Sequence, residues 1–578
     1  MIKRTLTIPA LIFFCLLPVS SQVIKQETGL KREVTLYNPY KPSLHEAKKR
    51  SFLPDMADTM KIRPDFHYET STKPFMPEYS IAPLKAATLL PDPLQKLYKS
   101  FVNIGMGNYT TPLAELSITT DRSKKGTIGF YGRHFSSNGN IELENGNEGF
   151  AGYMDNDASV YGRRYLKKSI FESSVDFTQK NRYAYGCDKS ITNYTPSRND
   201  IRMAYYNVGG EASLSSLTAD SADLSYKLDL NYNYFFNSTN LFQHTVGLGG
   251  TVAKSVKGLY IGSDISFDFY RLSDSILAIP EYTASIAPFI KKSTDKWSFK
   301  LGFRALVDKS MNNPSEFHIY PDMNFSVSIV PSFINLFAGL SGKLEKNEPL
   351  KIISENPFLM RDGTLFRLPD TDHEMIASAG FNGNAGLKGT YLLSVSYSMI
   401  TDMLLYSNLI FSDIALARGN GNYFSAMKDD TELLNVHAEL GGAITDKISV
   451  NGIANYYNYN LSVYDHAWNK PDWDGKLGVK YNLRNKIIAG MELTALGERN
   501  QVINGNNITV TTALPVAEQP VYLTRPVHFN LNLSAEYRLS PILSFWTKVN
   551  NISYDNYYEW ALYPSQRFLC MVGFTYSL

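Results

Sequence analysis

The residue types that could perform catalysis or bind a metal ion are present in this chain, but they are scattered. None of the nine histidines forms an i, i+2 or i, i+4 pair with another, whereas a metal site needs its ligands close together. The sequence contains no phosphate-binding loop, Gly-x-Ser-x-Gly turn, His-Glu-x-x-His or Cys-x-x-Cys motif. We therefore expect neither enzymatic activity nor a cofactor.

Two acidic clusters and three tryptophans are the remaining candidates for ligand binding. Asp155-Asn156-Asp157 and the segment 370–374 could hold a cation, although an exposed polar loop is the simpler interpretation. Trp468, Trp473 and Trp560 fall in long polar segments. Aromatic side chains in such segments can stack on a ligand, but packing within the loops or at a membrane interface is the favoured interpretation.

The strongest regular pattern lies at the C-terminal end of the chain. From Val527 to Leu539 every second residue is apolar, and the residues between them are polar. The last residues, from Phe568 to Leu578, also place apolar side chains at every second position. Since successive side chains of a strand point to opposite faces, each segment has an unbroken apolar face, which is typical of a barrel with lipid outside and water inside.

The same alternation recurs along the chain, for example in Asp223–Phe236 and Lys476–Arg484. Short Asp-, Asn- and Ser-rich turns alternate with long polar segments, as they do in outer-membrane barrels. We predict an all-β fold, a transmembrane antiparallel β-barrel of about 20 strands (range 18–22), over residues 97–578. The stretch 97–120 is read as one bent strand or two, and 137–166 as a polar insertion on the short-turn rim.

Charged residues on the polar faces are expected to line the lumen of the barrel. They carry both signs and include Lys227, Asp229, Lys480, Glu536, Arg538 and Arg567. Over the whole chain 57 basic residues balance 55 acidic ones, which does not favour a polyanionic partner such as nucleic acid. Outer-membrane lipids are the expected surroundings of the apolar face.

The N-terminal residues predict export from the cytoplasm. Lys3 and Arg4, an apolar stretch and the small residues at 19–21 form a secretory signal peptide over residues 1–21. No run of 18 apolar residues follows it, so no transmembrane helix is expected. Cys187 and Cys570 could pair in an oxidising compartment, but they lie far apart in the sequence. Cys570 falls on the apolar face of the last strand, so a lipid-facing side chain is the favoured interpretation.

Residues 22–96 differ in composition from the rest of the chain. They hold nine of the 27 prolines, a single glycine and no sustained alternation. Proline-rich sequence of this kind favours extended, poorly paired backbone. We predict a periplasmic arm or a partial filler of the lumen, in which 32–37 could pair with a partner's sheet edge or remain extended chain.

Several C-terminal motifs resemble those of the barrel of TonB-dependent outer-membrane receptors, particularly those of Bacteroidetes-type bacteria. They are Val549-Asn550-Asn551-Ile552, Tyr557, Tyr563-Pro564, Arg567-Phe568, Gly573 and the terminal aromatic strand. The chain departs from the family by ending in Leu578 where the family usually ends in Phe, and the 75 residues at 22–96 lack the pattern of a folded plug. Glu33, Val34, Thr35 and Leu36 are similar to a TonB box.

The resemblance implies a receptor-type barrel in the cell outer membrane that binds or takes up a small solute, with a reduced or absent plug. TonB, or a lipoprotein or other partner in the envelope, is the implied protein partner. Two alternatives remain open at this point: a structural or scaffolding barrel within an outer-membrane complex, and a plugless passive channel.

Overall fold

The computed structural model describes residues 98–578, except for 121–122, 145, 187–196, 218–223, 274–277, 311–313, 360–367, 387, 411–421, 504–519 and 554–556. The predicted signal peptide 1–21, the Pro-rich segment 22–96 and the TonB-box-like residues Glu33–Leu36 therefore lie outside the described residues. Cys187 lies outside them as well, while Cys570 carries a free thiol on the outward face of the last strand.

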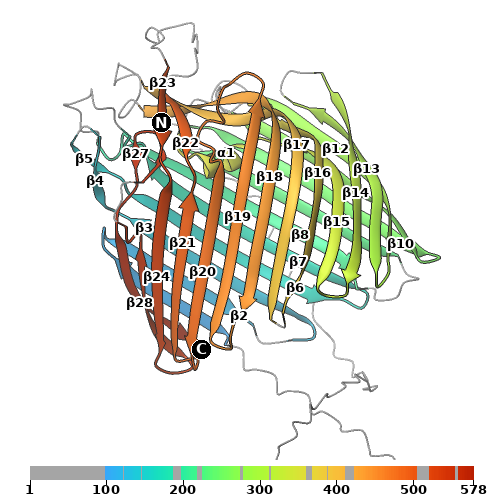
Figure 1. The fold of residues 1–578 in the computed structure, drawn as a ribbon, viewed down its shortest axis with the longest axis horizontal. Helices are drawn as coiled ribbons and strands as arrows, with labels where there is room; N and C mark the ends of the chain where they lie inside the picture. Colours follow the sequence, from blue (N-terminus) through green and yellow to red (C-terminus); the bar gives the residue numbers. More distant parts are fainter. Residues whose placement is uncertain are drawn as a thin grey trace, which may run out of the picture. The chain divides into compact units, whose positions relative to one another are not determined.

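The described residues form an antiparallel sheet that closes on itself (Figure 1). Of its 24 strands, β22 (Arg499–Ile503) and β23 (Val521–Arg525) form a side hairpin, and the other 22 make the barrel. The barrel strands are β1 (Ser100–Gly107), β2 (Thr111–Thr119), β3 (Gly126–Ser137), β6 (Tyr153–Tyr165), β7 (Ser169–Tyr183), β8 (Arg202–Ser216), β9 (Ser225–Asn237), β10 (Phe242–Val256), β11 (Leu259–Ser273), β12 (Ala278–Ser293), β13 (Trp297–Lys309), β14 (Glu316–Val330), β15 (Ile334–Glu345), β16 (Thr371–Ala385), β17 (Gly389–Ile410), β18 (Asn422–Ala443), β19 (Ile448–Leu461), β20 (Trp473–Leu483), β21 (Ile487–Leu496), β24 (His528–Arg538), β25 (Leu543–Asn550) and β28 (Leu569–Ser577).

The seam that closes the barrel lies between its first and last strands. Gly105 of β1 is paired with Gly573 of β28. A side chain at either glycine would collide with the ring of Trp546, whose atoms lie 2.5 Å from the Cβ position at Gly105. The indole N–H of Trp546 donates to Oδ1 of Asn103 at 2.7 Å. The two glycines therefore make room for a buried tryptophan that crosses the seam, which explains the Gly573 of the C-terminal motif.

Two rims can be distinguished by the length of their connections. One rim, here called the turn rim, carries tight turns such as Lys257-Gly258, where both residues have positive φ (51° and 80°), as a type I′ hairpin turn requires. The C-terminus lies at this rim, since Leu578 is bonded to Lys99 and Ser100. The opposite rim, the loop rim, carries β4 (Asn140–Glu142), β5 (Glu148–Phe150), α1 (Pro349–Glu355), the β22–β23 hairpin, β26 (Tyr558–Trp560) and β27 (Tyr563–Pro564) (Figure 1).

The count of 22 strands exceeds the predicted 20 at two places and stands at the upper limit of the expected range. The stretch 97–120 is two strands, joined by a tight turn in which Tyr109 and Thr110 have positive φ without a glycine. The prediction of a polar insertion at 137–166 was wrong, because β6 lies within it. Asn156 and Gly162 interrupt the apolar alternation of β6, which hid the strand. With β6 restored, the long connection 138–152 falls on the loop rim.

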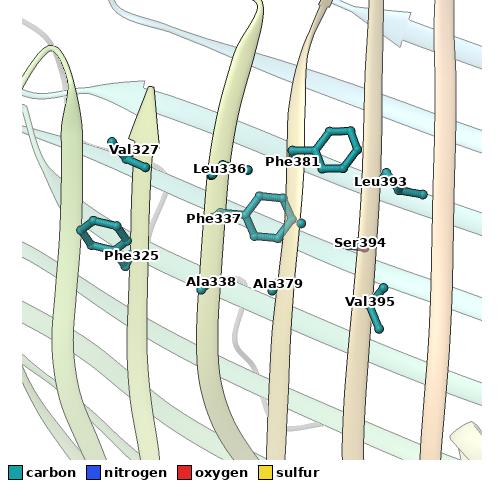
Figure 2. A pocket seen from close by; sticks show the side chains of 11 residues that line it. Phe325, Val327, Leu336, Phe337, Ala338, Ala379, Phe381, Leu393, Ser394 and Val395 are labelled. Carbon is teal, nitrogen blue, oxygen red and sulfur yellow. The ribbon is translucent and has the colours of Figure 1, made fainter. Parts of the chain in front are cut away.

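The apolar faces point outward, as the alternation predicts. Leu228, Leu230 and Tyr232 of β9 are 51%, 48% and 42% exposed. Likewise, Phe529 and Leu533 of β24 are 54% and 43% exposed. The outer wall carries a shallow apolar depression of about 490 Å³. In Figure 2 the small Ala338 and Ala379 lie in it among larger side chains such as Phe325 and Phe381. So much exposed apolar surface is stable only in contact with lipid. Among the described residues, no helix has the length and hydropathy to cross a bilayer.

Charge on this outer face is expected to prevent stable insertion, which gives a first prediction. Leu230→Arg should cost about 2–4 kcal/mol of folding free energy in lipid, because the guanidinium would lie in hydrocarbon. Asn231→Arg is the matched control, since the next residue of β9 points to the lumen and should cost little. Urea unfolding in liposomes measures both. Equal losses for the two variants would contradict the assignment of the faces.

Candidate functional site: a lid of loops and the cavity beneath it

A group of loops at the loop rim packs together, and it is here called the lid. Its members are α1 with residues 356–359, the rim ends of β17 and β18 (403–408 and 423–431), the loop 461–473, the β22–β23 hairpin and the β26–β27 hairpin. Their apolar side chains form two buried cores. The lid is thus a folded layer at the mouth of the barrel.

The rim ends of β17 and β18 form the middle of the lid, because both of their faces are buried. Leu404 and Tyr406 pack into the first core, whereas the alternating Met403 and Leu405 pack into the second. Leu405 has no exposed surface. A barrel strand facing lipid and lumen cannot have this pattern, so these residues have left the barrel wall.

A bulge explains where the two strands leave the wall. The β17–β18 register shifts between Ile400 and Met403, and Asp402 adopts a φ of 57°. The hydroxyl of Thr371 donates to the carbonyl oxygen of Asp402 at 3.0 Å, and the Asp402 N–H donates to Asp430 Oδ1 at 3.0 Å. Bulges bend strands in this way.

The inner face of the lid joins opposite walls of the barrel. In the ring of 22 strands β8 is sixth and β18 is sixteenth, so they are ten strands apart. The hydroxyl of Tyr205 on β8 donates to the carbonyl of Pro357 at 3.0 Å, and the next residue, Phe358, accepts the N–H of Phe424 on β18 at 3.1 Å. Loop residues therefore bridge the lumen directly.

The β26–β27 hairpin completes this bridge with aromatic side chains. The ring of Tyr563 stacks on Phe358 at 3.9 Å, and Trp560 meets Tyr406 and Phe424 edge to face at 5.5 and 5.2 Å. The backbone of the hairpin is also held, because Asn408 donates to the carbonyl of Ala561 at 3.1 Å. Such aromatic pairs add to the stabilisation from apolar burial.

The outer face of the lid is formed by the loop 461–473, which is anchored by a buried carboxylate. Asp429 is 3% exposed and accepts the backbone N–H groups of Val463 (3.1 Å) and Tyr464 (2.8 Å). Trp468 of the same loop is 4% exposed and stacks on Tyr522 of β23. The loop is thus held near its start and in its middle.

Asp429→Ala should release this loop without unfolding the barrel. Removal of the carboxylate takes the acceptor from two partly buried hydrogen bonds, at a cost of about 1–3 kcal/mol. Faster amide hydrogen exchange is expected in residues 461–473, with unchanged exchange in β9–β12. Asp446→Asn, an exposed carboxylate on the turn rim, is the control. Unchanged exchange in 461–473 would show that the loop is held by other contacts.

An ion-pair network fastens the α1 segment to the barrel wall. Nζ of Lys346 lies 2.6 Å from Asp370, 2.9 Å from Asp308 of β13 and 3.7 Å from Glu281 of β12, and the Lys346 side chain is only 10% exposed. Burial disfavours the charged form of Lys346, but the carboxylates of Asp370 and Asp308 outweigh it and raise its pKa. Burial raises the pKa of Asp370, and the positive charge of Lys346 lowers it by a smaller amount. One lysine therefore holds three carboxylates.

A cavity of about 430 Å³ lies against the inner face of the lid. Its walls are the rim ends of β6, β7 and β24, and its cover comes from the β26–β27 hairpin and residues 565–567. The lining is polar and aromatic: Tyr153, Asp155, Arg182, Tyr185, His528, Asn530, Asn550, Asn551, Tyr557, Glu559, Gln566 and Arg567.

The charges of the cavity differ in how they are paired. Arg182 donates to both oxygens of Asp155, at 2.7 and 3.3 Å. The side chain of Glu559 makes no hydrogen bond to a described residue. It is accessible to solvent, but protein atoms surround it on most sides. That enclosure raises the pKa of Glu559, and the nearby Arg499 and Arg182 oppose the shift. The Oδ1 atom of Asn530 is buried without a hydrogen-bond donor.

The structure brings only one of the six charged residues predicted from sequence to this cavity, namely Arg567. Lys227 and Asp229 form an ion pair of 2.9 Å on the inner face of β9. Glu536 and Arg538 pair at 3.1 Å near the turn rim, and Lys480 lies two strands away on β20. These five alternate along their strands with outward apolar residues, and they do not form one site.

The other candidates from the sequence have structural partners. Asp155 and Asp157 pair with Arg182 and Arg133, and Asp370 pairs with Lys346. No group of three or more His, Cys, Asp or Glu among the described residues is arranged to hold a metal ion. Trp468 and Trp560 are packed inside the lid. Sequence reasoning missed Lys346 between β15 and α1, Asp429 at the rim end of β18 and Glu559 on β26, because no motif marks any of the three.

Comparison with known proteins finds similarity in fold and none in sequence. No family model matches the sequence, and no curated protein matches it. Solved structures that match include the FrpB iron transporter from Neisseria meningitidis (TM-score 0.62, 9% identity, 84% of this chain and 83% of that chain) and the ferric-catecholate import receptor Fiu from Escherichia coli K12 (0.60, 8%, 84% and 82%). The ferripyoverdine receptor of Pseudomonas aeruginosa matches with a TM-score of 0.59 at 12% identity over 84% of this chain and 72% of that chain. The predicted resemblance is confirmed for the barrel fold.

Proposed function

We propose that this chain, which has the barrel fold of TonB-dependent outer-membrane receptors, is an outer-membrane receptor that admits a solute through a lid of its own loops. The observation that carries the proposal is the lid, which joins walls ten strands apart and covers a polar cavity. The loop rim faces the outside of the cell in such barrels. A solute from outside therefore enters the lumen only when the lid opens.

The lumen offers a polar path below the lid. Its wall carries ion pairs between neighbouring strands, such as Lys300–Asp322 at 2.6 Å and Lys476–Glu492 at 2.8 Å. Both signs are present, so the wall favours neither cations nor anions. Residues 22–96 are Pro-rich and nearly free of glycine, so in this proposal they form a periplasmic arm or a partial filler of the lumen in a receptor without a folded plug.

TonB is the proposed source of the energy that opens the path, through the segment Glu33–Leu36. A strand-like segment pairs with a partner's sheet edge through its backbone, and proline removes a backbone N–H. Val34→Pro should therefore reduce capture of the full chain by the immobilised periplasmic domain of TonB at least about tenfold, as expected for a loss of about 1.4 kcal/mol. Thr28→Pro is the control outside the segment. Equal capture of both variants and the unaltered chain would remove TonB from the proposal.

A scaffolding role in an envelope complex is the second candidate, and the double packing of the β17–β18 rim ends favours it. Because the β17–β18 rim ends are buried on both faces, the lid could be a permanently closed structure and need not be a gate that opens. Purification in mild detergent separates the two functions. A stoichiometric envelope partner, together with a lid that stays closed in every variant described below, would favour the scaffold over the receptor.

A further inference from the structure

We propose that the cavity beneath the lid is a binding site for short peptides with free ends. This inference rests on the proposed receptor function and names its substrate class. The volume of about 430 Å³ lies within the range of small-ligand sites, roughly 300–1,000 Å³.

The charge balance of the lining favours a zwitterion. Arg182 and Arg567 supply two positive charges, and Asp155 and Glu559 supply two negative charges. A site for a metal chelate of negative charge or for a phosphate would carry an excess of cations. A site for a neutral saccharide would have little reason to present a carboxylate such as Glu559, which has no hydrogen-bond donor among the described residues, to its ligand.

Glu559 is the group that recognises the positive end of the ligand. It stands on β26, on the lid side of the cavity, and has no hydrogen-bond donor among the described residues. An ammonium group supplies such donors together with the opposite charge, which makes the strongest kind of hydrogen bond. Arg567, whose guanidinium also lies 3.9 Å from Glu142, lines the same cavity, and its planar group suits the carboxylate end of a peptide.

The middle of the cavity suits a peptide backbone and its side chains. The buried Oδ1 of Asn530 lacks a donor, and a backbone N–H of the ligand would satisfy it. The side-chain amide of Asn550 can both donate and accept. The rings of His528 and Tyr557, stacked at 4.2 Å, form a flat surface for an apolar side chain of the ligand.

The test is equilibrium dialysis of the purified full chain in detergent against a mixture of random di- to tetrapeptides, with bound peptides identified by mass spectrometry. Peptides with free ends should be retained at least about tenfold over the same mixture acetylated and amidated, since blocking removes a charge-assisted hydrogen bond at each end. Glu559→Gln should remove that preference, and Asp446→Asn on the turn rim should leave it unchanged. Circular dichroism checks that each variant keeps its strands.

Three results would overturn the inference. In the first, neither the unaltered chain nor the Lys346→Met variant, in which the lid is loosened, retains any peptide. In the second, blocked peptides or a malto-oligosaccharide are retained as well as peptides with free ends. In the third, Glu559→Gln keeps the preference for free ends. Failure of the receptor function gives a different pattern, because peptides would still be bound while TonB capture and opening of the lid fail.

Discussion

Replacing Trp560 by alanine is expected to convert a closed barrel into a conducting one. Trp560 is 6% exposed and packs edge to face on Tyr406 and Phe424, which belong to the wall-derived middle layer of the lid. Truncation of a buried tryptophan costs about 3–5 kcal/mol. The loss of stability should be confined to the lid, because Trp560 does not belong to any strand of the barrel ring.

Single-channel recording in planar bilayers measures this effect. The unaltered chain should remain closed for most of the record, since its loops bridge the lumen. Trp560→Ala should show frequent openings with the large conductance of a wide barrel, because 16–18 strands already enclose an aqueous channel. Phe529→Ala on the lipid-facing wall is the matched aromatic control and should stay closed. A silent Trp560→Ala, or an unaltered chain that conducts steadily, would contradict the closure of the mouth.

Lys346→Met should release the α1 segment and is the second large effect. The substitution leaves Asp370, Asp308 and Glu281 without their shared cation. Removing one partner of a buried ion pair costs about 3–5 kcal/mol, because a buried charge is left uncompensated. Hydrogen exchange should accelerate in residues 349–359 and the thermal midpoint should fall.

The pH dependence of this variant follows from the direction of the Asp370 shift. Burial already raises the pKa of Asp370 in the unaltered chain, and loss of Lys346 removes the group that opposes that shift. An acid whose pKa is raised in the folded state destabilises it increasingly as pH rises above the unfolded value. The defect of Lys346→Met should therefore be larger at pH 8 than at pH 5.

A rescue and a control make the result specific to the network. Adding Asp308→Asn and Asp370→Asn to Lys346→Met should recover most of the lost stability, since neutral amides remove the uncompensated charge. Lys388→Met breaks an exposed ion pair with Asp446 on the turn rim and should change stability by less than about 1 kcal/mol. A defect that neither the amide pair nor low pH reduces would mean that Lys346 acts through packing.

Much of the barrel could be predicted from local pattern. Alternation in Val527–Leu539 assigned each residue to lipid or lumen, and the exposures of Phe529 and Leu533 agree with it. Prediction failed at β6, where polar and glycine residues fall on the outward face, and at the glycine-free turn of Tyr109 and Thr110. Both failures occurred where the local signal is weak.

The candidate site could hardly be predicted at all. The sequence predicts Arg567 as an inward-facing charge, and the structure places it in the cavity with Asp155 and Arg182, which lie 412 and 385 positions earlier in the chain. Trp560 lies in a long polar segment of the sequence, but nothing in the sequence marks Tyr406 and Phe424 as its neighbours. The alternation of side chains in a strand does not indicate whether the end of that strand bends over the lumen.

The sequence by itself therefore determined the architecture of this protein, an antiparallel barrel with an apolar outer wall and a polar lumen. It could do so because the alternation of side chains in a strand is local and repeats every two residues. Only the tertiary structure decided that the loop rim is closed by a lid and that a cavity lies beneath it. Those features depend on contacts between loops far apart in the chain, such as Tyr205 with Pro357 and Phe358 with Tyr563, and no local pattern records them.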